Sequence, residues 1–134
     1  MSLRWLVLLV ACSSPKPLVW APDETHAFER ARTEHKGVML EFYARWAMPS
    51  EELRHELSSA KIAGLIAPAF VPVTIDVSDD SDASQAQRAR YNAQTIPYIV
   101  FVTTSGKVVE RVDRLIEADA LTNVIEHAAS LARE

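Results

Sequence analysis

The stretch MLEFYARWAMPS, residues 39–50, joins an apolar strand to the start of a helix. Residues 38–43 are almost continuously apolar, which is typical of a central strand covered on both faces of a sheet. Pro49 follows at a position that the first turn of a helix tolerates, because that turn does not need the missing N–H. Glu51 and Glu52 come next, where the positive end of the helix macrodipole favours negative charge. The stretch therefore predicts a buried strand that passes directly into a helix.

Outward from this stretch, the two hydrophobic periods alternate along the chain. We expect strands at residues 18–20, 38–43, 70–77, 97–102 and 108–112, and helices at 22–36, 49–66, 83–93 and 116–131. Asp23 is the expected N-cap of the first helix and Gly37 is its expected stop. A break near Ser58 is expected to divide the second helix. The order β-α-β-α-β-α-β-β-α predicts an α/β fold with a mixed central sheet and helices on both faces.

Length and composition limit the classes of protein that the chain can represent. A chain of 134 residues has the length of one domain, and 49% hydrophobic residues are enough for a packed core. The formal net charge of −4 gives no electrostatic reason to expect nucleic acid as a partner. The acidic run 76–82 lacks the central glycine and final glutamate of a calcium loop, and the histidines show no ligand spacing. We therefore expect no metal site, no cofactor and no nucleic-acid partner.

Residues 1–11 are predicted to be a signal peptide rather than part of the fold. A positive charge, Arg4, precedes the apolar run 5–11, which is shorter than the ~20 residues that span a bilayer. The sequence LVAC at residues 9–12 resembles the bacterial lipobox, which implies cleavage before Cys12 and a lipid on its thiol. Residues 12–17 then form the lipidated cysteine and a polar tether, and residues 18–134 form the domain. Ser13 after the cysteine favours anchoring at the periplasmic face of the outer membrane.

Two other interpretations of this segment stay open. Ala11-Cys12-Ser13 also resembles a site for ordinary signal peptidase, which would release a soluble periplasmic protein. Alternatively, the segment is a buried N-terminal strand with Cys12 in the core, although Arg4 and the Ser/Pro run fit a leader better. In each case Cys12 is the only cysteine of the sequence, so no intrachain disulfide forms.

Residues 39–50 resemble the active-site segment of the thioredoxin family. In that family an apolar strand ends in an acid, two aromatics and an alanine, followed by Trp-Cys-x-x-Cys. Residues 95–98, Thr-Ile-Pro-Tyr, resemble the loop whose proline is cis and faces the active site. The turn at 103–107 and the final helix also match, so the resemblance covers residue 18 to the end and implies a thioredoxin fold. The wording Phe-Tyr-Ala-x-Trp and the segment 61–70 are similar to the periplasmic thioredoxin-like domain of transmembrane thiol:disulfide interchange proteins.

The resemblance carries the fold but not the redox chemistry. The family's two cysteines fall on Ala47 and Ser50. In the family, the first is a thiolate nucleophile at a helix N-terminus and the second releases the product. Alanine offers no nucleophile, and a serine hydroxyl is too weak an acid to replace a thiolate. Dithiol exchange is therefore excluded for this sequence, and hydrogen bonding or helix capping is what remains for Ser50.

Glu41 matches the family's buried acid, which assists proton transfer at the second cysteine. Without the thiols that role is lost. We expect instead a partly buried carboxylate near the end of the sheet, whose pKa is raised by desolvation.

Five other positions match the family's peptide-binding surface. The backbone before a cis proline exposes an N–H and a C=O that can pair with an extended peptide in β fashion. The alternatives are that Tyr43 and Trp46 only pack the end of the sheet, and that the proline only shapes a turn. The resemblance assigns binding to Trp46, Met48, Pro49, Ile96 and Pro97.

Two hypotheses about function follow from these residues. The first is a redox-inactive, exported, lipid-anchored module that binds a protein or extended peptide across Trp46, Met48 and Pro97, as a chaperone-like factor or an envelope-assembly subunit. The second is a thiol:disulfide oxidoreductase whose two cysteines have been replaced deliberately in this sequence. The codons of the natural gene at positions 47 and 50 distinguish the two.

Overall fold

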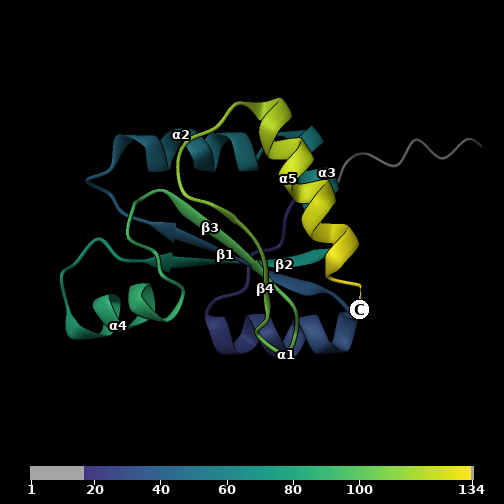
Figure 1. Cartoon of the computed structure of the whole chain (residues 1–134), viewed down its shortest axis with the longest axis horizontal. Helices are drawn as coiled ribbons and strands as arrows, with labels where there is room; N and C mark the ends of the chain where they lie inside the picture. The colour runs from purple at the N-terminus through teal and green to yellow at the C-terminus, as the bar shows by residue number, and fades with distance from the viewer. Residues whose placement is uncertain (1–16, 134) are drawn as a thin grey trace, which may run out of the picture.

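The computed structural model describes residues 17–133, which form one four-stranded sheet and five helices. In chain order the elements are α1 (Glu24–Glu34), β1 (Gly37–Tyr43), α2 (Met48–Leu57), α3 (Ala60–Ile66), β2 (Phe70–Asp76), α4 (Asp82–Arg90), β3 (Tyr98–Val102), β4 (Val108–Val112) and α5 (Ala118–Leu131). The strands lie in the order β2-β1-β3-β4. Helix α1 covers one face of this sheet, while α2, α3 and α5 cover the other (Figure 1).

The central strand β1 is parallel to β2 and antiparallel to β3, and all seven of its residues are buried. Its first residue has to be glycine, because a Cβ on Gly37 would lie 2.6 Å from the carbonyl oxygen of Val102 and 2.9 Å from the Phe70 ring. Strand β4 pairs with β3 through an antiparallel hairpin, which makes the sheet mixed. The predicted α/β class and mixed sheet are confirmed.

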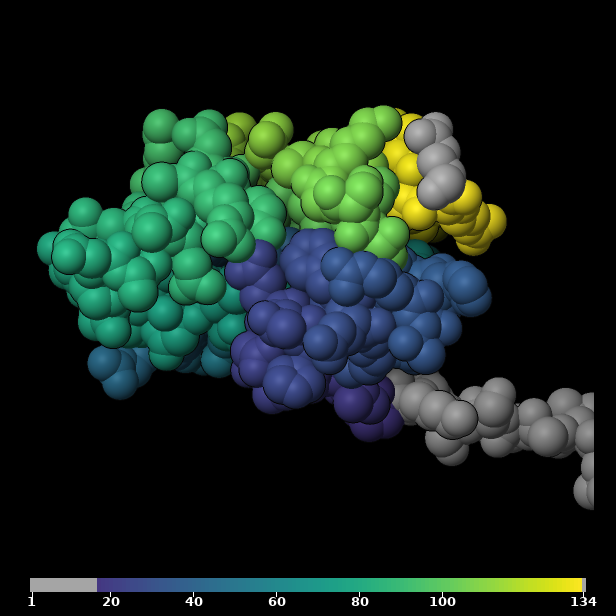
Figure 2. Space-filling model, turned by 90° about the horizontal axis from the view of Figure 1, so that it is seen from below, coloured from purple at the N-terminus to yellow at the C-terminus, as the bar shows by residue number. Residues whose placement is uncertain are grey.

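Two apolar cores lie on the two faces of the sheet. On the α1 face, Ala27 and Ala31 pack against side chains such as Val38 and Leu40. Helix α4 lies beside α1 (Figure 2), where the Glu24 carboxylate accepts hydrogen bonds from the Tyr91 hydroxyl at 2.6 Å and from Arg90 at 3.2 Å. On the opposite face, α2, α3 and α5 bury the side chains Leu53, Leu57, Ile62, Ile66, Leu121 and Ile125 against the sheet.

The helix ends confirm two predictions and correct a third. Asp23 caps α1 by accepting the His26 N–H at 2.8 Å, as predicted. The predicted break is also present, because α2 ends at Leu57 and the Ser59 side chain caps α3. The predicted stop at Gly37 is wrong, since α1 ends at Glu34 and His35 takes the left-handed conformation with φ of 55°. Gly37 is instead needed for the close approach of β1 to its neighbours.

The expected first strand at 18–20 is reduced to a single β-bridge. Ala21 pairs with Val73 of β2, and its N–H donates to the carbonyl of Pro72 at 2.8 Å. Pro72 has no N–H to return, and prolines 17 and 22 bracket the segment, so a longer ladder cannot form. Helix α4 likewise ends at Arg90, three residues before its predicted end.

Within residues 17–133, none of the helices has the length and apolarity needed to cross a bilayer. The predicted signal peptide and most of the predicted tether, including Cys12, lie outside the residues that the structure describes.

Candidate functional site

The loop between β1 and α2 presents Trp46 at one end of the sheet. The indole N–H donates to the carbonyl of Ser78 at 3.1 Å, and the Arg45 N–H donates to the Ser78 hydroxyl oxygen at 2.9 Å. Ser78 is itself held by the Asp76 carboxylate, which accepts its N–H at 2.9 Å. The loop is thus fastened to the segment that follows β2, so the indole is fixed at its nitrogen while 63% of the residue stays exposed.

Trp46, Met48 and Pro49 together form an exposed apolar surface, called here the Trp46–Pro49 surface. Met48 is 74% exposed, Pro49 is also exposed, and both belong to the first turn of α2. Isolated exposed apolar residues are common, but large ones next to each other are typical of contact surfaces. The alternative that Trp46 packs the end of the sheet is wrong, whereas Tyr43, 8% exposed, does pack there.

The two positions that match the family's cysteines, Ala47 and Ser50, are buried although they alternate in sequence with the residues of this surface. Ala47 is the N-cap of α2 and makes no side-chain cap, and it is 7% exposed. Ser50 is 1% exposed, and its hydroxyl has no hydrogen-bond partner among residues 17–133. The expectation that Ser50 hydrogen-bonds or caps through its side chain is therefore wrong. A buried hydroxyl without a partner costs about 1–3 kcal/mol of stability.

The loop before β3 brings Ile96 and Pro97 to the same end of the sheet. The Ile96–Pro97 peptide bond is cis, as the resemblance implies. Ile96 is half-buried and packs against the core cluster that contains Ala47 and Tyr98. Pro97 itself is buried, so its side chain is not part of the exposed surface that Trp46 and Met48 form.

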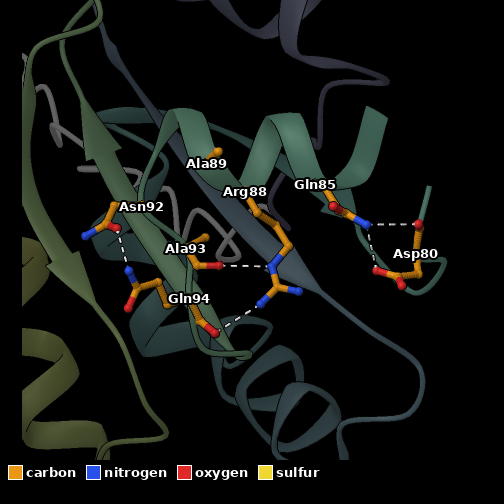
Figure 3. A pocket seen from close by; sticks show the side chains of 7 residues that line it. All are labelled: Asp80, Gln85, Arg88, Ala89, Asn92, Ala93 and Gln94. Atoms are coloured by element: carbon orange, nitrogen blue, oxygen red, sulfur yellow. Dashed lines mark hydrogen bonds between the residues drawn. The ribbon is translucent and has the colours of Figure 1, made fainter. Parts of the chain in front are cut away.

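A polar hollow of about 660 Å³ lies beside this loop, and side chains that line the hollow hold the loop in place (Figure 3). The Arg88 guanidinium points across it and donates to the carbonyls of Ala93 and Gln94, each at 3.0 Å. The Gln94 amide donates to Asn92 at 3.1 Å. These hydrogen bonds tie α4 to the segment that leads to Ile96 and Pro97.

Glu41 lies in the central strand β1 and is fully buried, whereas the sequence predicted a partly buried carboxylate near the end of the sheet. Its side chain is 1% exposed, and one carboxylate oxygen accepts from the Thr74 hydroxyl at 2.9 Å and from Arg54 at 3.3 Å. Thr74 is its partner in the β1–β2 register. Burial raises the pKa of Glu41, and the charge and hydrogen bond of Arg54 act in the opposite direction. The predicted raised pKa of a desolvated carboxylate is confirmed.

Arg54 was not singled out by the sequence, although it connects the site to the sheet. Its guanidinium carbon lies 3.8 Å from the centre of the Tyr43 ring, a cation–π contact. The Tyr43 hydroxyl donates in turn to the Glu51 carboxylate. The chain Thr74–Glu41–Arg54–Tyr43–Glu51 therefore joins β2, β1 and the first turns of α2.

A family model described as thioredoxin-like matches residues 19–104, which is more than half of the chain. The chain belongs to the thioredoxin-like family. Three solved structures illustrate the likeness. A thioredoxin from Thermus thermophilus has a TM-score of 0.75 at 19% identity, with 86% of this chain and 89% of that chain covered. A DsbH oxidoreductase has a TM-score of 0.69 at 21% identity, with 87% of each chain covered.

The third is the reduced C-terminal domain of DsbD from Neisseria meningitidis. Its TM-score is 0.67 at 25% identity, and the match covers 78% of this chain and 92% of that chain. No curated protein matches the chain. The thioredoxin-like fold is thus established by the family match and by the structures together.

Within this thioredoxin-like domain, residues 17–133 contain no cysteine and hold no group of three metal-ligating side chains that could bind an ion. The structure brings Trp46, Met48 and Pro49 together as an exposed surface and places Ala47, Ile96 and Pro97 behind it. What it offers chemically is a fixed indole and an exposed thioether.

Proposed function

We propose that this thioredoxin-like domain binds an extended segment of another protein at the Trp46–Pro49 surface and performs no thiol chemistry. The observation that carries the proposal is that Ala47 and Ser50 are buried at the two cysteine positions of the family, while the neighbouring residues Trp46 and Met48 are exposed. The position at the helix N-terminus offers no nucleophile, while the apolar contact surface beside it is present. Binding is then what the site can still do.

The indole of Trp46 is suited to such binding because its orientation is already set by Ser78. A residue that is fixed before binding loses little conformational freedom on contact. Aromatic side chains that become desolvated in a complex are the most frequent hot spots, and methionine adapts to differently shaped partners. The surface therefore favours an apolar side chain of an extended segment over a polar small molecule.

Binding is tested with a labelled unfolded peptide, the reduced and carboxymethylated insulin B chain, in a fluorescence anisotropy titration. Trp46→Ala is expected to weaken binding about tenfold or more, in line with the loss of one hot-spot aromatic. Val19→Ala is the matched control, because Val19 is 68% exposed and lies outside the surface. Equal affinity of the two variants would contradict the proposal.

The absence of thiol chemistry is tested with an insulin-reduction assay in dithiothreitol, with the chain beside an Ala47→Cys/Ser50→Cys variant. We expect no catalysis by the chain as it stands, and any activity above the uncatalysed rate would refute the proposal. Activity of the double variant would show that the scaffold still supports dithiol exchange.

The second candidate is a thiol:disulfide oxidoreductase whose cysteines have been replaced deliberately. It is favoured by Glu41, which keeps a buried carboxylate with a raised pKa in the sheet. Codons for cysteine at positions 47 and 50 of the natural gene would establish it, and codons for alanine and serine would exclude it.

We further propose that the domain is exported and anchored through a lipid on Cys12, on the periplasmic face of the outer membrane. The support is the lipobox-like sequence at 9–12 and the polar, proline-containing segment after it. Metabolic labelling with a palmitate analogue is expected to mark the wild-type chain and not Cys12→Ser. A soluble, unlabelled wild-type protein in the periplasm would favour ordinary signal peptidase instead.

A further inference from the structure

Helix α2 carries a stripe of solvent-accessible side chains that begins at the Trp46–Pro49 surface, with Met48 and Glu52 exposed and Glu56 half-buried. Residues four apart lie on the same side of a helix, so Met48, Glu52 and Glu56 follow one another along it. Glu51 and His55 flank this line. The stripe therefore changes from apolar at the N-terminus of α2 to acidic further along.

A groove of about 630 Å³ separates this acidic part of α2 from the segment that enters α5. Leu115 is 39% exposed in it, and Ile116 is half-buried and packs on the core below. The groove thus has apolar side chains within it and carboxylates on its walls. Its lining is Glu51, Glu52, His55, Glu56, Leu115, Ile116, Glu117 and Ala118.

The negative charge of this groove is not balanced by neighbouring cations. No lysine or arginine lines it, and the side chains of Glu52, Glu56 and Glu117 make no hydrogen bond or ion pair with the residues that the structure describes. The nearby cations are used elsewhere, since Lys61 lies 3.6 Å from Asp119 and Arg54 pairs with Glu41. A concave surface with one sign of charge concentrates the opposite charge.

Charge complementarity favours a cationic side chain over a metal ion as the occupant of the groove. Across residues 17–133 no three carboxylate, histidine or cysteine side chains converge closely enough to hold a metal. Lysine and arginine instead reach separate carboxylates with a mobile head while the aliphatic stem lies on an apolar surface. Leu115 supplies such a surface between the carboxylates of the groove.

We propose that the groove receives lysine or arginine side chains of the same extended segment that the Trp46–Pro49 surface binds. This inference rests on the proposed function and specifies its ligand as a basic peptide. From Met48 to Glu56 the helix rises about 12 Å, which an extended chain covers in roughly three to four residues. The ligand therefore carries an apolar residue with basic residues three and four positions away.

The probes are three fluorescein-labelled ten-residue peptides in a serine, alanine and glycine background. Each has one leucine, and the third and fourth residues after it are both lysine, both glutamine or both glutamate. Their affinities for the full chain are measured by anisotropy at about 50 mM and about 500 mM salt, because screening shortens the Debye length severalfold over this range. The lysine peptide is expected to bind about tenfold more tightly than the glutamate peptide at low salt, and nearly equally at high salt.

Two triple variants locate the effect on the surface. Glu52→Gln/Glu56→Gln/Glu117→Gln is expected to remove the preference for the lysine peptide. The control Glu29→Gln/Asp82→Asn/Glu126→Gln removes the same charge from exposed residues outside the groove and is expected to keep the preference. Circular dichroism and the urea midpoint establish that both triple variants are folded.

The outcomes separate the two proposals. Equal affinity for the lysine, glutamine and glutamate peptides, with binding lost in Trp46→Ala, overturns the groove and leaves the proposed function standing. A lysine preference that persists in the groove variant also overturns it, because the preference then arises from net charge. No binding of any peptide, insulin B chain included, overturns both proposals.

Discussion

The unpartnered hydroxyl of Ser50 leads to a stability prediction of unusual sign, since most substitutions of buried residues are destabilising. Ser50→Ala removes an oxygen that is buried without a hydrogen bond, which relieves about 1–3 kcal/mol of desolvation cost. The void that it leaves is below ~20 Å³ and costs at most about 0.5 kcal/mol at ~24 cal/mol per Å³. The free energy of unfolding is therefore expected to rise by about 0.5–2.5 kcal/mol.

The assay is urea unfolding followed by far-ultraviolet circular dichroism. With a slope near ~1.5 kcal/mol per molar urea, the midpoint is expected to rise by roughly 0.3–1.7 M. Ser50→Cys is expected to be at least as stable as the wild type, because a buried thiol tolerates the lack of a partner. The same measurement on Ala47→Cys/Ser50→Cys shows whether that double variant is folded in the insulin assay.

Ser84→Ala is the matched control, because Ser84 is 6% exposed but its hydroxyl donates to Asp79 at 2.5 Å. Losing that bond is expected to lower the free energy of unfolding by at least about 1 kcal/mol. If Ser50→Ala lowers the midpoint as Ser84→Ala does, the Ser50 hydroxyl has a partner in solution and the reasoning is refuted. An unchanged midpoint for Ser50→Ala also counts against it.

Three further predictions concern charge, backbone approach and the binding surface. Burial raises the pKa of folded Glu41 above its ordinary 4.5, so the stability it contributes is complete below pH 4.5 and is lost as pH rises through the folded pKa. Glu41→Gln does not titrate and is expected to gain stability over the wild type as pH rises from about 4.5 through the folded pKa, at about 1.4 kcal/mol per tenfold change in proton affinity. Urea midpoints of the two proteins that stay parallel above pH 4.5 would contradict this. Gly37→Ala is expected to lower the free energy of unfolding by about 2 kcal/mol or more, because its Cβ would lie 2.6 Å from the Val102 carbonyl oxygen. Gly64→Ala has open space for the Cβ in a helix and is expected to raise the free energy of unfolding by about 0.5–1 kcal/mol. Thermal unfolding of the two variants should therefore show midpoint shifts of opposite sign. Met48→Ser is expected to weaken binding of the leucine peptides severalfold and Val19→Ser to leave it unchanged, as anisotropy titrations would measure.

Most of the fold could be predicted because its signals are local. The continuous apolar run of β1, the proline and glutamates after it, and the serine break between α2 and α3 each act within a few residues. The length of the first strand was not predictable in the same way, because it depends on which backbone hydrogen-bonding groups β2 presents at its edge. Pro72 lies some fifty residues away in sequence and withholds the N–H that a longer ladder would need.

In the candidate site, too, the features that depend on local sequence could be predicted and those that depend on tertiary packing could not. The replacement of both cysteines and the burial of Glu41 could be inferred from one stretch of sequence. The part played by Arg54 could not, because it depends on the β1–β2 register that sets Thr74 beside Glu41 and on the rotation of α2 over Tyr43. The isolation of the Ser50 hydroxyl is equally a property of packing, since the same residue at an exposed first turn would bind water.

The single bridge at Ala21 also bears on how copies of this domain behave at high concentration. Strand β2 is at the edge of the described sheet, and an uncovered edge is a template on which another chain can add a strand and begin aggregation. Here the middle of that edge is occupied by Ala21 and interrupted by Pro72, which has no donor for an incoming strand. Although the first strand is shortened to a single bridge, the β2 edge is thus protected against the addition of a strand from another chain.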